Sequence, residues 1–281
     1  MDTSDLLNSK MLHVCCTPGP LLSEEAPWLD DASGWFDGYR PSATKPATPA
    51  RTRDGRVVED GRVRIGTWNL AGRWGAHHLE LVLSLDCDIL LLTEVSTRVS
   101  LPGYCLHPTA GLMARGRYWA AVGAWTDLRP LPDPHGASAM AEVGGVRVCA
   151  SILPWRTCGA CEPWVGTSSE EKTAEAVAAV EAAGPMVWGG DWNHGLVGTE
   201  GAGSIGGRQR IISAVDRLGL VVPTEYLPHR LPRRYAIDHV AVPNTWEIVA
   251  AERVSGVVGG VALSDHDAYV VTGSPVARPQ S

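Results

Sequence analysis

Five short stretches of the sequence place a carboxylate, an amide or an imidazole at the end of an apolar run or inside one. They are GTWNL, DILLLTEV, WGGDWN, AIDHV and LSDHDAY. The polar residues in them are Asn69, Glu94, Asp191, Asn193, Asp238, Asp265 and His266. A turn, a cap or a hydrogen-bonded core histidine explains each one singly. A glutamate at the end of a run such as DILLLTE, however, is costly to bury without a partner, and a shared metal ion would supply that partner.

Asp191 and Asn193 are separated by one residue at the end of VWGGDWN. Side chains alternate between the two faces of a strand, so residues i and i+2 point the same way. The alternation predicts that this carboxylate and this amide face one site, and the two glycines before them would let the backbone turn close to a metal. The alternative is an ordinary turn, because Asp, Asn and Gly all form turns.

Hydrophobic periodicity predicts the elements that position these residues. Strands are expected at 61–70, 87–95, 117–125, 186–192, 234–243, 245–254 and 266–273, with a hairpin over 140–153 that turns at Gly144-Gly145. Helices are expected at 76–86, 167–184 and 207–220. Strands outnumber helices, and the hairpin and the closing run of strands imply antiparallel pairs. The pattern therefore predicts an α/β fold in which two sheets pack face to face with helices on their outer faces.

Two of these helices carry local signals. The segment 167–184 has Ser168 and Glu171 at capping-box spacing, and Gly184 followed by Pro185 ends it. The segment 76–86 places Leu79, Val82 and Leu83 on one apolar stripe, which we expect to face the core.

The composition limits the class of protein. The chain has 281 residues, is 44% hydrophobic and carries a net charge of −7. No apolar run approaches the roughly 20 residues that span a bilayer, and the N-terminus lacks the basic and apolar regions of a secretory signal. We therefore expect a cytoplasmic protein without a membrane span. The acidic charge argues against a protein that coats nucleic acid, but not against an enzyme that handles a phosphodiester locally.

The chain divides into a proline-containing N-terminal segment and a remainder with regular periodicity. Residues 1–60 include RPSATKPATPARTRDG, which has the composition of a linker, so we expect a poorly ordered extension there. Residues 61–275 are expected to form one domain, and residues 276–281 a tail.

Taken together, the five stretches resemble the endonuclease/exonuclease/phosphatase superfamily, which has the DNase I-like fold. The order and spacing of GTWNL, DILLLTEV, WGGDWN, AIDHV and LSDHDAY carry this resemblance, which covers about 61–273. It implies a two-sheet α/β sandwich with the site at one end of the sheets, in agreement with the strand pattern.

The resemblance implies a metal site and a catalytic group. Glu94 matches the metal-binding glutamate, Asn69 the asparagine that helps place metal and phosphate, and Asp265 an additional acidic residue sometimes assigned to metal. Such oxygen ligands suit Mg²⁺ or Mn²⁺. Asp191 matches the aspartate that orients or deprotonates the attacking water, and Asn193 the amide that holds the phosphate.

His266 and Asp238 complete the implied catalytic group. His266 matches the histidine beside the phosphate, and Asp238 the aspartate that pairs with it. A carboxylate behind an imidazole fixes its tautomer and keeps it protonated when it contacts a phosphate.

The sequence departs from the resemblance after the hairpin at 140–153. Many family members have a His or Tyr there on the leaving-group side, whereas this chain reads CASILPWRTCGACEPW. The local candidates are Ser151, Trp155 and Arg156. Arg156 could bind a phosphate oxygen, and Trp155 could stack on a base or ring or simply pack in the core. His194, beside Asn193, could also reach the site.

The expected function is that of a Mg²⁺-dependent phosphoester hydrolase, a nuclease-like phosphodiesterase. Its substrate is either a nucleic acid or a small phosphorylated molecule such as a lipid, an inositol or a nucleotide. The alternatives are a small-molecule phosphatase and a non-catalytic interaction module on the same fold.

Overall fold

The computed structural model of the chain describes residues 61–198 and 202–276. The expected extension over 1–60 and residues 277–281 of the expected tail lie outside the described residues. In the described part, no helix has the length and apolar character needed to cross a bilayer.

A seven-stranded sheet contains the first and the last strand of the described chain. Its order is β12-β15-β1-β2-β5-β3, and β4 pairs with β5. The strands are β1 (Val63–Asn69), β2 (Ile89–Ser96), β3 (Cys105–Pro108), β4 (Leu112–Met113), β5 (Arg117–Ala124), β12 (Trp246–Val254) and β15 (Ala268–Pro275). β1 and β2 are parallel, whereas β15 is antiparallel to β1, so β1 and β2 end where β15 begins.

A six-stranded sheet lies beside it, in the order β10-β11-β9-β8-β7-β6. Its strands are β6 (Leu128–Pro130), β7 (Ser138–Val143), β8 (Val146–Ser151), β9 (Val187–Asp191), β10 (Leu220–Val221) and β11 (Asp238–Pro243). β8 and β9 are parallel, and β11 is antiparallel to β9. A separate two-stranded ribbon joins β13 (Val257–Val258) and β14 (Val261–Ala262) just before β15.

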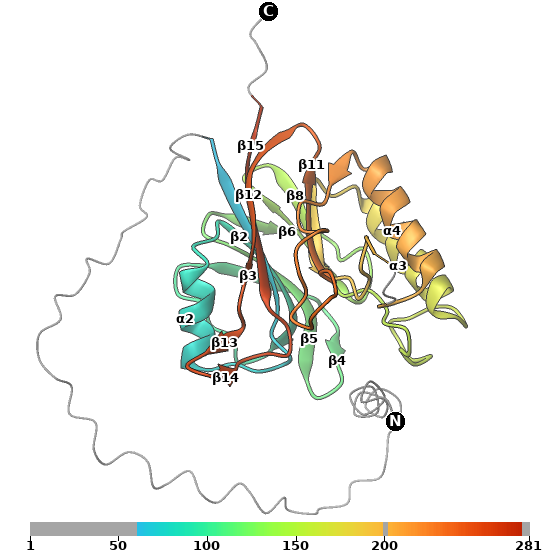
Figure 1. Cartoon of the computed structure of the whole chain (residues 1–281), viewed down its shortest axis with the longest axis horizontal. Helices are drawn as coiled ribbons and strands as arrows, with labels where there is room; N and C mark the ends of the chain where they lie inside the picture. The colour runs from blue at the N-terminus through green and yellow to red at the C-terminus, as the bar shows by residue number, and fades with distance from the viewer. Residues whose placement is uncertain (1–60, 199–201, 277–281) are drawn as a thin grey trace, which may run out of the picture.

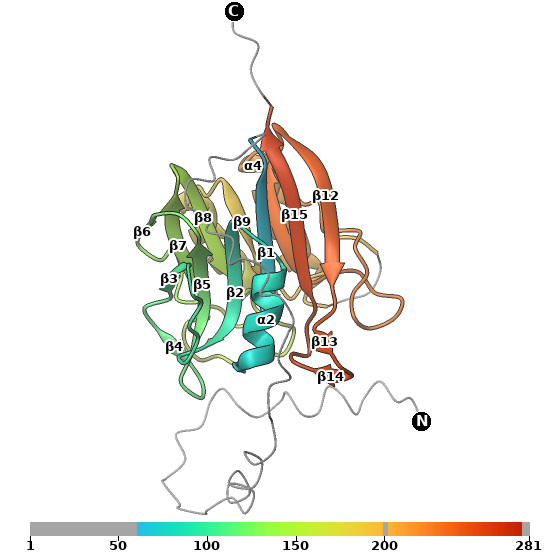
Figure 2. The same cartoon turned by 90° about the vertical axis from the view of Figure 1, so that its left-hand side faces the viewer.

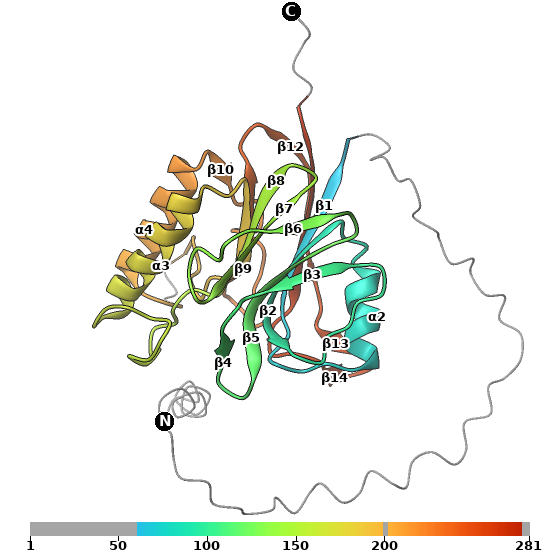
Figure 3. The same cartoon turned by 180° about the vertical axis from the view of Figure 1, so that it is seen from behind.

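In the described part of the chain, three helices cover the outer faces of the two sheets. Helix α2 (Ala76–Ser84) lies against the outer face of the first sheet, over β1 and β2 (Figure 2). Helices α3 (Ser169–Ala183) and α4 (Ile205–Arg217) lie side by side against the outer face of the second sheet (Figure 1). The view from behind shows the same succession of helix, sheet, sheet and helix pair (Figure 3). The predicted α/β sandwich is therefore confirmed.

The core forms three apolar layers that match this succession. Between the sheets, Ile65, Leu91 and Val122 of the first sheet pack with Val148 and Val240 of the second. A second layer lies under α2, and a third lies under α3 and α4. Continuous runs such as ILLL in β2 are buried on both faces because each sheet packs against a sheet on one side and a helix on the other.

Local signals in the sequence were confirmed at the ends of elements. Ser168 and Glu171 form the predicted capping box, and Gly184 closes α3 in the left-handed conformation with φ 62°. Gly144 and Gly145 turn the β7–β8 hairpin with φ 56° and 82°.

Two predictions about elements were wrong in detail. In α2 the buried residues are His78, Leu81 and Val82, whereas Leu83 is 38% exposed, because the helix contacts the sheet along a stripe rotated from the predicted one. The strand predicted to begin at residue 234 begins only at Asp238. The residues before it belong to a loop that runs beside the site.

Candidate active site

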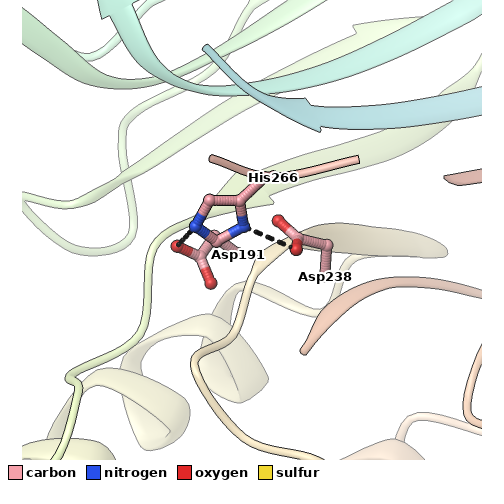
Figure 4. A group of neighbouring side chains, drawn as sticks. All are labelled: Asp191, Asp238 and His266. Atoms are coloured by element: carbon pink, nitrogen blue, oxygen red, sulfur yellow. Dashed lines mark hydrogen bonds and ion pairs between the residues drawn. The ribbon is translucent and has the colours of Figure 1, made fainter. Parts of the chain in front are cut away.

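Three titratable side chains meet at one end of the two sheets. His266 Nδ1 lies 2.8 Å from Asp238 Oδ2, and His266 Nε2 lies 3.9 Å from Asp191 Oδ2 (Figure 4). Both aspartates are buried, with 3% and 1% of their surface exposed for Asp191 and Asp238. The imidazole therefore lies between two carboxylates, with the Nδ1–H group donating to Asp238 and the Nε2 side facing Asp191.

Burial and mutual charge shift the protonation of this group. Burial raises the pKa of Asp191 to about 7, the charge of Asp238 adds to the increase, and His266 and Asn69 oppose it. Burial lowers the pKa of His266, but the carboxylates of Asp238 and Asp191 more than compensate, so this pKa is well above its usual value. At neutral pH the imidazole is therefore protonated, whereas Asp191 is near its titration point.

The strand register brings the two aspartates together. Asp191 is the last residue of β9, Asp238 is the first residue of β11, and the two are directly paired across the antiparallel ladder. Like charges in this position destabilise a sheet. His266 precedes β15 in the other sheet, and its position between the two carboxylates supplies the compensating charge.

Gly189 and Gly190 make room for the neighbouring strands. A Cβ atom added at Gly190 would lie 2.1 Å from the Ser151 carbonyl oxygen on β8. One added at Gly189 would lie 2.4 Å from the His239 carbonyl oxygen on β11. Gly190 also has a φ of 127°. The glycines thus permit close strand packing beside Asp191, and the expectation that they turn the backbone toward a metal stays a prediction.

Asn193 lies next to Asp191 through a turn and not through strand alternation. The strand ends at Asp191, and Asn193 has a left-handed φ of 53°. Its backbone N–H donates to Asp191 Oδ1 at 3.1 Å, and its side-chain Nδ2 donates to the Leu153 carbonyl at 3.0 Å. The turn formed by Asp191 and Asn193 orients the Asp191 carboxylate. The ordinary turn that the sequence offered as the alternative is therefore itself part of the candidate site.

Asn69 links Asp191 to Glu94. Its Nδ2 lies 2.9 Å from Asp191 Oδ2 and 3.3 Å from Glu94 Oε1, and its Oδ1 accepts a bond from the Ala71 N–H. The amide therefore directs its NH2 group, and not its oxygen, toward the carboxylates. Glu94 Oε2 also lies 2.7 Å from Arg117 Nη1.

Glu94 has a strained backbone. Its φ is 48°, in the left-handed region that a residue with a long side chain rarely adopts. Such strain costs on the order of 1–3 kcal/mol and persists where the surrounding structure enforces it. The N–H of Gly72 donates to the Glu94 carbonyl and the N–H of Leu70 to the Thr93 carbonyl, so the loop after β1 holds this part of β2.

The donor set of the site fits a divalent cation. Polar atoms of Asp191, Asp238 and His266 lie within 4.8 Å of one another, but a protonated imidazole has no free lone pair, so only the two carboxylates of this group could bind a cation. Asp238 Oδ1 is buried and has no hydrogen-bond partner within 61–198 and 202–276. Carboxylate oxygens from Glu94 and Asp191, joined through Asn69, are ligands that Mg²⁺ and Mn²⁺ accept.

Asp265 lies at the exposed edge of the site. Its side chain is exposed, unlike those of its neighbours Ser264 and Asp267, and its charge raises the pKa of His266. Ser264 Oγ lies 2.6 Å from the Asn69 carbonyl oxygen and 3.4 Å from Asp265 Oδ1. Asp265 is thus connected through Ser264 to Asn69 at the end of β1, and Asn69 in turn contacts Glu94 on β2.

His194 does not join the site, which corrects the expectation that it could reach it. The ring is fully buried, Nδ1 lies 2.7 Å from the Trp192 carbonyl, and Nε2 accepts a bond from the Ser204 N–H at 3.2 Å. Both nitrogens are thus used by the backbone. Burial lowers its pKa, so the ring is neutral and connects β9 to the start of α4.

The residues after β8 that departed from the resemblance have structural contacts. Ser151 is buried, and its hydroxyl contacts Ser138 Oγ and Trp188 Nε1. Trp155 is half-buried against the core under α3, with its ring 6.3 Å from that of Trp164. Arg156 is exposed and donates to the Gly203 carbonyl.

Two further residues contact the site and were missed in the sequence. Ser264 donates to the Asn69 carbonyl and accepts a bond from the His266 N–H, so it fixes β1 relative to the histidine. Its place immediately before Asp265 and His266 was the available signal. Arg117 contacts Glu94 only because β2 and β5 pair with Ser96 opposite Arg117, and a single sequence does not reveal that register.

Solved structures with the same fold were found. The endonuclease domain of TRAS1, a telomere-specific non-LTR retrotransposon, has a TM-score of 0.55 and 14% identity, covering 76% of this chain and 99% of that domain. An endonuclease/exonuclease/phosphatase protein from Bacteroides vulgatus has a TM-score of 0.53 and 13% identity over 76% and 99%. The human Nocturnin catalytic domain with bound sulfate has a TM-score of 0.50 and 14% identity over 76% and 94%. No family model and no curated protein sequence matches the chain.

The chain has the fold of the endonuclease/exonuclease/phosphatase superfamily, which confirms the resemblance seen in the five sequence stretches at the level of the fold. The site described above lies at one end of that fold.

Proposed function

We propose that the chain is a divalent-cation-dependent phosphodiesterase of the nuclease type, in which water attacks a phosphate at the Asp191–His266–Asp238 site. The observation that carries this proposal is a protonated histidine held between two buried carboxylates in this fold. A cation beside a carboxylate with a raised pKa is the pairing that attack on an anionic ester requires.

His266 binds the phosphate, and Asp238 orients His266. The Asp238 carboxylate accepts the Nδ1–H group, which fixes the ring and stabilises its positive charge. In the proposed complex the Nε2–H group, which faces Asp191 at 3.9 Å, donates to a phosphate oxygen. Asn193 lies in the turn after Asp191. A short movement of its side-chain amide would provide a second donor to the phosphate.

Asp191 orients and deprotonates the water. Its carboxylate is held by the Asn69 amide and the Asn193 N–H, so its direction is fixed before substrate binds. A pKa of about 7 in the cation-free protein matches a general base that works near neutral pH.

Glu94, with Asp265, would hold Mg²⁺ or Mn²⁺, while Asn69 keeps the Glu94 carboxylate in place. When bound, the cation supplies positive charge that neutralises charge developing on the phosphate. The strained backbone of Glu94 supports this assignment, because strain is retained where it contributes to function.

The loop over residues 225–235 favours a nucleic acid as the substrate. Arg230 donates to the Ser264 carbonyl, which places the loop beside His266. Tyr226 and Tyr235 are 68% and 39% exposed, with their rings 6.3 Å apart. Exposed aromatic rings near arginines bind bases and phosphates of single strands. The similarity to the TRAS1 endonuclease domain agrees with this substrate class.

The test is release of product from a panel of phosphoesters with Mg²⁺ or with EDTA. The panel contains plasmid DNA, single-stranded DNA, RNA, bis-p-nitrophenyl phosphate and a phosphomonoester. Asp191→Asn is the blank, because it keeps the shape of the side chain and removes the base. We expect EDTA-sensitive hydrolysis of diesters by the wild-type protein only.

Two results would contradict this proposal. Hydrolysis confined to the phosphomonoester would make the chain a small-molecule phosphatase. Absence of turnover on every member would favour a non-catalytic interaction module.

A further inference from the structure

Arg117 is a charged residue beside Glu94, and the proposed mechanism gives it no role. Its Nη1 lies 2.7 Å from Glu94 Oε2, and the two side chains are only 19% and 25% exposed for Arg117 and Glu94. Arg117 Nε is buried and has no hydrogen-bond partner in the described part of the chain. The Nε–H group of this arginine therefore lacks an acceptor, and leaving a buried donor unsatisfied costs free energy.

The surrounding backbone holds the guanidinium against the site. Arg117 begins β5, opposite Ser96 of β2. A Cβ atom added at Gly72 would lie 2.7 Å from both Cδ and Nη1 of Arg117, so the side chain lies directly on the loop after β1. Arg117 is thus enclosed between that loop and Glu94, unlike a solvated surface ion pair.

The ion pair between Arg117 and Glu94 bears on cation binding. Glu94 is the carboxylate to which we assign the divalent cation, and it already carries a monovalent counterion. A guanidinium and a divalent cation on one carboxylate repel each other, and at partial burial this repulsion is weakly screened. The two positive groups therefore compete for Glu94.

We propose, on the basis of the proposed function, that Arg117 is the counterion that a divalent cation displaces from Glu94, and that the displaced guanidinium then binds the phosphate group of the substrate. In the cation-free protein Arg117 keeps Glu94 oriented. Once displaced, its unused Nε–H and its freed Nη1–H donate to phosphate oxygens. Cation binding therefore prepares the site for the anionic substrate.

The first test measures cation affinity without substrate. Mn²⁺ is titrated calorimetrically into the wild-type protein, Arg117→Met and the control Arg115→Met, which changes an exposed arginine two residues away. Removal of the competing charge is expected to tighten Mn²⁺ binding about tenfold in Arg117→Met. Arg115→Met should bind as the wild type does.

The sign of the change separates competition from a structural role. If Arg117 only supported the fold of the site, its loss would weaken Mn²⁺ binding and lower the thermal midpoint. Arg117→Gln and Arg117→Lys form a second pair: Gln should behave as Met does, and Lys, which keeps the charge, should bind Mn²⁺ as the wild type does.

The second readout concerns the substrate. At saturating Mn²⁺, Arg117→Met should raise KM for bis-p-nitrophenyl phosphate more than it lowers kcat, because a phosphate-binding donor is lost. Unchanged or weaker Mn²⁺ binding in Arg117→Met and Arg117→Gln would overturn the inference, as would an unchanged KM.

Glu94→Gln separates this inference from the proposed function. If Glu94→Gln binds Mn²⁺ as tightly as the wild-type protein, the cation assignment itself is wrong. If Glu94→Gln loses the cation while Arg117→Met leaves the affinity unchanged, only the role of Arg117 is wrong.

Discussion

Asp191 and Asp238 are paired across β9 and β11, in a position where two like charges repel. His266 reduces that repulsion by contacting both carboxylates. Two buried carboxylates that repel each other do not stabilise the sheet, and this arrangement around one imidazole agrees with the catalytic role proposed above. At the scale of single residues, the feature that matters most is therefore the interaction of the His266 imidazole with the carboxylates of Asp191 and Asp238.

Replacement of His266 tests this view. His266→Ala removes the proposed phosphate donor and leaves Asp191 and Asp238 facing each other, so we expect kcat for bis-p-nitrophenyl phosphate to fall by about 10²–10⁴-fold. The measurement is the initial rate with saturating Mg²⁺, together with circular dichroism to verify folding. His77→Ala, on the exposed face of α2, is the matched control. Activity within twofold of the wild type in His266→Ala would refute the site.

At the scale of elements, each strand end supplies one or two functional groups, and the strands need close packing to bring them together. β9 lies between β8 and β11, and its two glycines allow the backbones of both neighbours to approach. The position of Asp191 therefore depends on Gly189 and Gly190, which precede it and have no side chains.

Gly190→Ala tests that dependence. The new methyl group would overlap the Ser151 carbonyl, and alanine is disfavoured at a φ of 127°. We expect the free energy of unfolding to fall by more than about 3 kcal/mol, with loss of activity beyond the loss of folded protein. Urea denaturation measures the first effect, and rates per folded molecule measure the second.

Gly195→Ala is the control for this substitution. An added Cβ at Gly195 would meet no atom closer than the Val197 carbonyl oxygen at 3.7 Å, so a small change in stability is expected. Equal effects of the two substitutions would show that packing of β9 does not position the site.

The motifs at the strand ends could be recognised in the sequence because local patterns determine them. Glu94 follows the apolar run of β2 as predicted, whereas Asp265 and His266 lie just before β15, which begins at Ala268 and not at residue 266. Contacts that depend on the register of strands far apart in the chain could not be recognised. The pair of Arg117 and Glu94 is one such contact, and the burial of His194 between β9 and α4 is another.

At the scale of the whole molecule, the core contains neutral histidines that respond to acid. His239 follows Asp238 on β11 but faces the layer under α3 and α4, where its ring lies 5.1 Å from that of Trp192. Burial lowers the pKa of His239 from 6.5 to about 4. The unfolded chain therefore binds a proton at this residue below pH 6.5, whereas the folded protein does not until about pH 4.

This difference predicts acid sensitivity with a defined sign. Stability from His239 is fully present above pH 6.5 and is lost as the pH falls toward 4, with about 2 kcal/mol lost between pH 7.5 and pH 5. The check is urea denaturation at both pH values for the wild-type protein and His239→Gln. The variant should lose about 2 kcal/mol less stability than the wild type over this interval. Parallel losses in the two proteins would contradict the prediction.

The position of β15 has a consequence for biosynthesis. The last long strand of the described chain is inserted between β12 and β1, and His266 lies immediately before it. A ribosome releases the amino-terminal strands first, yet β1 lacks its antiparallel partner until translation has passed Pro275. The group formed by Asp191, Asp238 and His266 would thus be complete only after synthesis of this strand. A nascent chain that stalls before β15 would expose an unpaired edge of β1 and would lack the strand that positions His266 between Asp191 and Asp238.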